Sequence, residues 1–128
     1  MAETVLDASA LLAFLNDEPG ADVVLAYLGE AVISAVNLSE TACVLIRIGM
    51  PEETARSILT GLPLRVVAFD DNLALATAAL LPFTRHAGLS LGDRACLALA
   101  RSLQVPALTA DRAWSGLNLD IEVKVIRA

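Results

Sequence analysis

Short apolar runs alternate along this chain with stretches whose apolar residues recur every three to four positions. The runs predict five strands, at residues 3–6, 31–34, 64–69, 105–109 and 121–127. Helical spacing predicts helices between them, over residues 9–18, 21–30, 36–48, 51–62, 70–88 and 90–103. Because the strands are apolar throughout and alternate with helices, we expect a mostly parallel, about five-stranded central sheet covered on both faces. This is a three-layer α/β/α fold.

Proline and glycine refine several boundaries of these elements. Pro51 is predicted to take the first helical position of its helix, followed by two glutamates in the first turn. The helix over 70–88 is expected to bend or break before Pro82 and to end at Gly88. Residues 111–116 are expected to form a single helical turn.

Length and composition indicate the class of protein to which the chain belongs. A length of 128 residues allows one domain, 1–128, with a hydrophobic core, and 56% of the residues are apolar although only 4% are aromatic. No apolar run approaches the roughly 20 residues of a membrane helix, and the N-terminal segment lacks the basic region of a signal peptide. We therefore expect a soluble, cytoplasmic protein without membrane contact. Cys43 and Cys96 fall in apolar helical patterns and are predicted to be small buried side chains.

The charge balance limits what the protein can bind by itself. Nine basic and fifteen acidic residues give a net charge of −6, and Lys124 is the only lysine. Nucleic-acid binding usually depends on a basic surface. An acidic protein that handles nucleic acid therefore needs a divalent cation at the contact or a local basic rim.

Four acidic residues lie at or near the starts of predicted helices: Asp7, Glu40, Asp93 and Asp111. Helices that follow parallel strands begin at the carboxyl edge of the sheet, so at least three of these acids are expected at one edge. Helix capping is the competing interpretation, because Ser90 with Asp93 and Asn37 with Glu40 both have the spacing of a capping box. Crowded carboxylates, however, raise one another's pKa values and destabilise a fold unless a cation neutralises them. The shared edge therefore favours a metal site, with Ser9 rather than Asp7 as the expected helix cap.

Four segments in this order resemble one known family. The stretches "VLDASALLAFL", "SAVNLSET", "LSLGDRACLALA" and "LTADRAW" are similar to the PIN-domain family, and most of all to its VapC-type toxins of bacterial toxin–antitoxin pairs. The resemblance extends from Val5 to the final strand. It implies a Mg²⁺- or Mn²⁺-dependent endoribonuclease that acts as a toxin, forms a homodimer and is blocked by the C-terminal segment of a cognate antitoxin protein.

The resemblance places an acidic tetrad on Asp7, Glu40, Asp93 and Asp111. Hard cations prefer carboxylate oxygens, so we expect Asp7, Asp93 and Asp111 to hold the metal. Glu40 is then expected to orient or deprotonate the attacking water. Some relatives have Asn in place of Asp111 and a further acid soon after, whereas here the next acid is Asp120.

Substrate contacts are predicted for residues next to the tetrad: Ser9, Thr109, Arg94 and Arg112. The two hydroxyls can bind a carboxylate or a phosphate, or cap a helix instead. The two arginines can bind phosphate of an RNA substrate. His86 is expected at a helix end, and Trp114 is expected to anchor a turn in the core.

Other functions remain open. One alternative is a non-catalytic α/β binding module whose acids are only helix caps, and another is a non-toxin PIN nuclease of RNA processing. A phosphatase-like enzyme of the haloacid dehalogenase type is disfavoured. Such a site needs a second aspartate where Ser9 stands and a lysine near the phosphate, whereas Lys124 lies in the last predicted strand.

Overall fold

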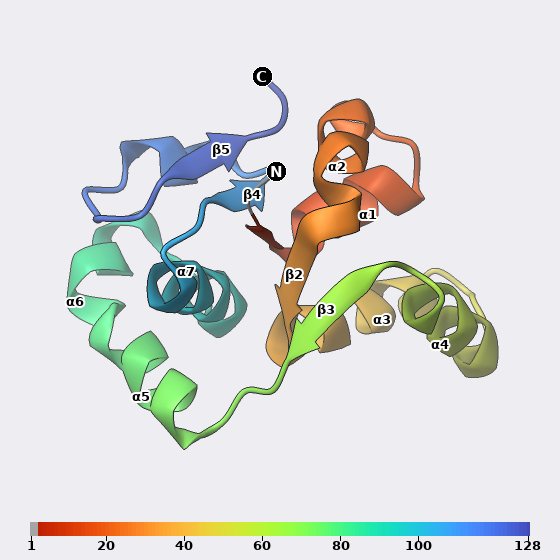
Figure 1. The fold of residues 1–128 in the computed structure, drawn as a ribbon, viewed down its shortest axis with the longest axis horizontal. Helices are drawn as coiled ribbons and strands as arrows, with labels where there is room; N and C mark the ends of the chain where they lie inside the picture. Colours follow the sequence, from red (N-terminus) through yellow and green to blue (C-terminus); the bar gives the residue numbers. More distant parts are fainter. Residues whose placement is uncertain (1–2) are drawn as a thin grey trace.

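Figure 1 shows the computed structural model, in which residues 3–128 are described. Its five strands are β1 (Thr4–Leu6), β2 (Ala31–Ser34), β3 (Leu64–Val67), β4 (Ala107–Thr109) and β5 (Val123–Val125). They form one sheet in the order β3-β2-β1-β4-β5, and all four strand pairings are parallel. The predicted parallel five-stranded sheet is thus confirmed.

The helical elements follow the strands in chain order: α1 (Ala8–Leu15), α2 (Ala21–Tyr27), η1 (Leu28–Glu30), α3 (Ala35–Arg47), α4 (Glu52–Thr60), α5 (Asp71–Ala79), α6 (Leu81–Thr84), η2 (Arg85–Ala87), α7 (Leu91–Leu103) and η3 (Arg112–Gly116). The predicted break before Pro82 separates α5 from α6, and Gly88 ends η2 in the left-handed conformation with a φ of 67°. Pro51 lies one position earlier than predicted. Its extended ψ of 144° makes it the N-cap, so that α4 begins at Glu52.

Two hydrophobic clusters pack on opposite faces of the sheet, which confirms the three-layer arrangement. On β1, Leu6 packs with side chains of α1 to α4, whereas the preceding Val5 packs with α7 and with Trp114 of η3. Successive residues of a strand point to opposite faces, so a short apolar strand supplies both clusters. In Figure 1, α1 to α4 lie on one side of the sheet and α5 to α7 on the other. Within residues 3–128, no helix is long and apolar enough to cross a bilayer.

The strand order determines which segments meet at the carboxyl edge of the sheet. β1 is the central strand and pairs with β2 on one side and β4 on the other. Leu6, the last residue of β1, is therefore in register with Ile33 of β2 and Leu108 of β4. β2 and β3 lie on one side of β1, and β4 and β5 lie on the other, so the strand order changes direction at β1. Ligands of open parallel sheets bind outside the strand ends at such a switch point.

Candidate active site

A cavity of about 420 Å³ opens beyond the carboxyl ends of β1 and β4. Its wall contains all four predicted acids, Asp7, Glu40, Asp93 and Asp111. The remaining lining residues are Ala8, Ser9, Asn37, Ser39, Cys43, Val44 and Arg47. We call this space the acidic cavity. The four acids are far apart in the sequence and come from four different elements or loops, so the fold itself brings them together.

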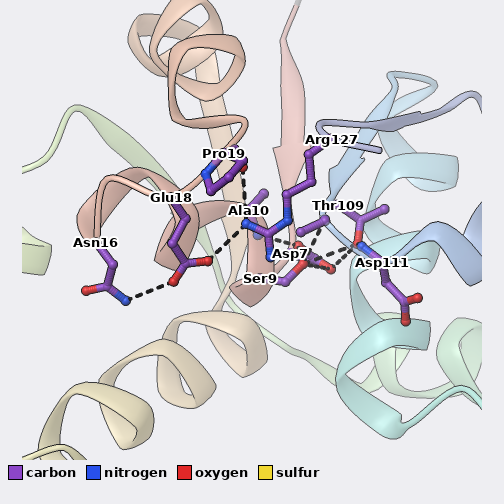
Figure 2. Close-up of polar contacts among 10 residues, drawn as sticks. Asp7, Ser9, Ala10, Asn16, Glu18, Pro19, Thr109, Asp111 and Arg127 are labelled. Atoms are coloured by element: carbon purple, nitrogen blue, oxygen red, sulfur yellow. Dashed lines mark hydrogen bonds and ion pairs between the residues drawn. The ribbon is translucent and has the colours of Figure 1, made fainter.

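Asp7 is the most buried of the four acids, with 4% of its surface exposed. Its Oδ1 accepts a 2.8 Å hydrogen bond from the backbone N–H of Ala10, which makes Asp7 the N-cap of α1. The hydroxyl of Ser9 donates to both carboxylate oxygens, and Thr109 donates to Oδ2 at 2.6 Å. Figure 2 shows both hydroxyls directed at this carboxylate. The expectation that Ser9 caps α1 is therefore wrong: Asp7 caps the helix and Ser9 supports the cap.

Burial raises the pKa of Asp7 from its usual 3.8 to about 6. Loss of hydration disfavours the charged form, and the nearby Asp93 carboxylate adds to this effect. The hydrogen bonds from Thr109, Ala10 and Ser9 act in the opposite direction because they stabilise the carboxylate. Asp7 thus carries a negative charge at neutral pH, at a cost that a bound cation would relieve.

Asp93 lies in the first turn of α7 and combines two roles that looked like alternatives in the sequence. Its Oδ2 accepts a 2.9 Å hydrogen bond from the backbone of Ser90, and the Ser90 hydroxyl accepts one from the Asp93 backbone. This is the predicted capping box. The same carboxylate lines the acidic cavity and raises the pKa of Asp7. Capping therefore does not remove Asp93 from the cavity.

Asp111 forms the outer wall of the cavity, after the end of β4. Its Oδ1 accepts a 2.9 Å hydrogen bond from Ala113 and so caps η3, while its backbone N–H donates to the hydroxyl of Thr109 at 3.0 Å. Thr109 therefore connects Asp111 with Asp7 through a single hydroxyl. Asp120, the next acid in the chain, forms an ion pair with Arg101 and does not line this cavity.

Glu40 projects from the second turn of α3 towards the start of α7. Its Oε1 accepts a 2.9 Å hydrogen bond from the side-chain amide of Asn37. The predicted capping box is wrong here, because Ser34 caps α3 and Asn37 lies inside the helix, almost fully buried. The spacing of three residues that resembles a capping box instead places Asn37 and Glu40 on one helix face.

Several predicted substrate contacts lie elsewhere than expected. Arg94 is directed at α5, where its Nη1 approaches the carbonyl of Thr77 at 3.5 Å. Neither Arg94 nor Arg112 lines the acidic cavity. Arg47, in the last turn of α3, is the basic side chain in the cavity wall. Helical periodicity could have indicated it, because Arg47 lies two turns after Glu40 on the same face of the helix.

The two cysteines differ from each other in a way the apolar pattern did not predict. Cys96 is fully buried in α7, as expected, and burial together with the carboxylates of Asp7, Asp93 and Glu40 raises the pKa of its thiol. The thiol therefore stays protonated beneath the acidic cavity. Cys43 is exposed and lines the cavity, because it lies on the same face of α3 as Glu40. Trp114 is buried, as predicted.

The donor set of the cavity fits a hard divalent cation. Across residues 3–128, no three acidic, histidine or cysteine side chains lie close enough together to enclose an ion directly. Mg²⁺ usually takes only one or two protein carboxylates and keeps several waters, so carboxylates spread around a cavity suit it. The side-chain oxygen of Asn37 is buried there without a hydrogen-bond partner in the described part of the chain. This unpaired oxygen acceptor, together with the four carboxylates, favours the binding of a cation and its coordinated water in the cavity.

Comparison with known proteins gives a consistent family and fold. The family model described as PIN domain matches residues 4–118. No curated protein sequence matches the chain significantly. A toxin–antitoxin complex from Klebsiella pneumoniae aligns at 18% identity over 96% of this chain and 97% of the other, with a TM-score of 0.75. DNA-bound VapBC from Salmonella typhimurium aligns at 17% identity over 97% and 98%, with a TM-score of 0.74.

A third similar structure carries a stated activity. VapC20 from Mycobacterium tuberculosis, described as a toxin that cleaves the sarcin–ricin loop, aligns at 19% identity over 93% of this chain and 98% of the other. Its TM-score is 0.74. At identities this low, the three likenesses show the fold.

Proposed function

Because this chain belongs to the PIN domain family, we propose that it is a Mg²⁺- or Mn²⁺-dependent endoribonuclease and the toxin of a cytoplasmic toxin–antitoxin pair. The observation that carries the proposal is the acidic cavity, in which carboxylates from four separate parts of the chain face one space at the switch point of the sheet. Helix caps at the carboxyl edge of a parallel sheet share that edge, but capping alone does not require four carboxylates to line one cavity.

Asp7, Asp93 and Asp111 are the proposed metal-holding residues. All three line the cavity, and each uses one of its carboxylate oxygens to accept a backbone hydrogen bond. Ser9 and Thr109 fix the Asp7 carboxylate in place. When bound, the cation supplies positive charge that stabilises the negative charge developing on the phosphoryl oxygens.

Glu40 is the proposed general base. The water oxygen forms a bond to phosphorus, its proton passes to the Glu40 carboxylate, and the bond from phosphorus to the leaving ribose oxygen breaks. The leaving oxygen takes a proton from solvent, so one RNA end carries the phosphate and the other a free hydroxyl. Glu40 is suited to this step because it faces the cavity, and among the described residues only its Oε1 has a side-chain donor, Asn37.

Arg47 is the side chain that we propose as the main phosphate contact. Four carboxylates repel a polyanion, and Arg47 is the basic residue in the same wall. Within residues 3–128 it forms no ion pair with these acids, which leaves its guanidinium available to a phosphate oxygen there. The contacts predicted for Arg94 and Arg112 remain secondary proposals, because both lie outside the cavity wall.

We propose further that a cognate antitoxin covers the cavity. A mainly apolar groove of about 290 Å³ lies between α3 and α4, and its lining includes Leu38, Ala42 and Leu59. Ser39 lines both this groove and the acidic cavity, so the two adjoin at this residue. A partner segment with an apolar stretch followed by a basic side chain would fill the groove and neutralise the acids. A small adjoining reading frame for a DNA-binding protein would support this partner.

The homodimer implied by the family resemblance is also a proposal. Apolar side chains on consecutive helices, among them Leu75 with 72% and Phe83 with 56% of their surface exposed, provide surface for a second copy. Light scattering of the purified chain tests this, and replacing Leu75 and Phe83 with Ser is expected to leave a folded monomer. An unchanged dimer would place the contact elsewhere on the molecule.

The principal experiment is cleavage of purified tRNA and rRNA with Mg²⁺ or Mn²⁺, with Asp7→Asn as the inactive control. Cleavage by the parent and not by the variant supports the nuclease. If no RNA is cleaved and Mn²⁺ does not change the thermal stability, the non-catalytic binding module is favoured. The capping hydrogen bonds of Asp7, Asp93 and Asp111 support that alternative, because they give these acids a structural role. Cleavage by the parent chain, together with failure to find any antitoxin protein that binds it, would favour the RNA-processing nuclease.

A further inference from the structure

The carboxylate of Glu40 lies against the first turn of α7 at a position where that helix has no side chain. A Cβ atom built on Gly92 would overlap with the Glu40 carboxylate carbon and with both of its oxygens. Gly92 is buried in the second position of α7, and its backbone does not have a positive φ. The backbone at this position does not require glycine, and alanine would favour the helix. The lack of a side chain at Gly92 therefore leaves the space that the Glu40 carboxylate occupies.

Asn37 holds the same two groups from the other side. It is 1% exposed, and its amide nitrogen donates to Glu40 Oε1 at 2.9 Å and to the carbonyl oxygen of Gly92 at 3.0 Å. Both hydrogens of the amide are used in these bonds. One side chain of α3 thus fastens the Glu40 carboxylate to the same glycine of α7 that makes space for it.

We propose that Asn37 and Gly92 are positioning residues that hold Glu40 at its working place in the acidic cavity. We call the pair the Glu40 cradle. Gly92 provides the space, and Asn37 fixes the carboxylate in it while joining α3 to α7. The proposal rests on the proposed function for the role of Glu40 as general base, but the cradle itself is a property of the fold.

A double-mutant cycle measured by thermal unfolding tests the space at Gly92. Gly92→Ala is expected to lower Tm in the parent chain, because the new methyl group displaces the carboxylate. In a Glu40→Ala background, the same substitution is expected to leave Tm unchanged or raise it, because the overlap is gone and alanine favours the helix. Gly29→Ala is the matched control, since a Cβ at Gly29 meets no atom within 4 Å. It is expected to have the same small effect in both backgrounds.

An equal loss of Tm from Gly92→Ala in both backgrounds would overturn this part of the proposal, because the methyl group would then disturb something other than Glu40. The cycle needs neither metal nor RNA. Its result therefore stands even if no RNA is ever cleaved, and the failure of the cradle is distinguishable from the failure of the nuclease.

Asn37→Asp tests the hydrogen bonds of the cradle. The substitution keeps the size of the side chain but replaces the amide donor with an oxygen that repels Glu40. With Mn²⁺ and RNA, we expect kcat to fall by roughly tenfold to a hundredfold with little change in KM, since a general base contributes roughly 10²- to 10⁴-fold. In a Glu40→Ala background, Asn37→Asp is expected to lower kcat no further. An unchanged kcat, or an equal loss in both backgrounds, would show that Asn37 does not act through Glu40.

Discussion

The hydroxyl of Thr109, at the end of β4, donates a 2.6 Å hydrogen bond to the carboxylate of Asp7, just beyond the end of β1. The same hydroxyl accepts a hydrogen bond from the backbone of Asp111. Two neighbouring strands of the sheet are thus joined at the acidic cavity by one polar side chain. The position of the most buried acid depends on the pairing of β1 with β4.

Thr109→Val is expected to weaken both the fold and the acid site. It removes a buried donor to a charged oxygen, a loss that costs about 1–3 kcal/mol, which urea denaturation measures. Because this hydrogen bond lowers the pKa of Asp7, its loss should move the acidic limb of the cleavage profile to higher pH. Thr77→Val is the matched control, since Thr77 is equally buried but its hydroxyl bonds within its own helix. Equal effects of the two substitutions would contradict a special role for Thr109.

The metal-free protein is expected to lose stability as pH rises from about 4 to about 6. The pKa of Asp7 is about 6 in the folded protein and 3.8 when unperturbed, so the folded state holds the proton more tightly in this range. Its contribution is favourable below pH 3.8 and is lost as pH rises through 6, by about 3 kcal/mol in total. Denaturation curves at several pH values measure this. Asp7→Asn keeps a capping oxygen but should remove the slope, and the idea fails if both proteins show the same slope.

Mn²⁺ is expected to raise the thermal stability of the parent chain, because an ion that binds only the folded state stabilises it by about 2.7 kcal/mol at a hundred times Kd. Asp7→Asn and Asp93→Asn should abolish this effect while leaving the metal-free protein at least as stable as the parent at neutral pH. Asp70→Asn is the control, because Asp70 caps α5 in the same way but lies outside the cavity. A Mn²⁺ effect that survives in the Asp93 variant would remove Asp93 from the proposed metal site.

Arg47→Gln is expected to weaken RNA binding without changing kcat. If Arg47 contacts one phosphate, the slope of log affinity against log salt concentration should become less steep by about 0.7, the value for single strands. Fluorescence anisotropy on an inactive Asp7→Asn background measures it. Arg56→Gln changes the charge equally, but Arg56 is paired with Glu52 and lies outside the cavity. If Arg94→Gln or Arg112→Gln alters the slope and Arg47→Gln does not, the sequence-based contacts replace Arg47.

Periodicity predicted the elements well because burial on a parallel sheet leaves a strong pattern. The strand at 31–34 is found at those residues, since Val32 and its neighbours are buried on both faces. Side-chain roles were harder to predict. Asp7 rather than Ser9 caps α1, because cap geometry depends on the angle at which the chain leaves the strand.

Contacts between distant segments could not be read from local spacing. The spacing of Asn37 and Glu40 matched a capping box, but Ser34 begins the helix and Asn37 instead meets Gly92, 55 residues later in the chain. In the sequence, Gly92 looked like an ordinary residue near a helix start. Only the packing of α3 against α7 explains why this position has no side chain. In the same way, Arg94 follows an acid of the cavity in sequence but points away from it, towards α5.

The strand order has a consequence for how the protein is made. Asp7 and Glu40 are translated early, but β4, which carries Thr109 and leads to Asp111, pairs with β1 only after more than a hundred residues have been synthesised. A nascent chain that has reached α7 still lacks one wall of the acidic cavity. A ribosome that produces the proposed nuclease is therefore not exposed to the completed acidic cavity until translation has passed Asp111.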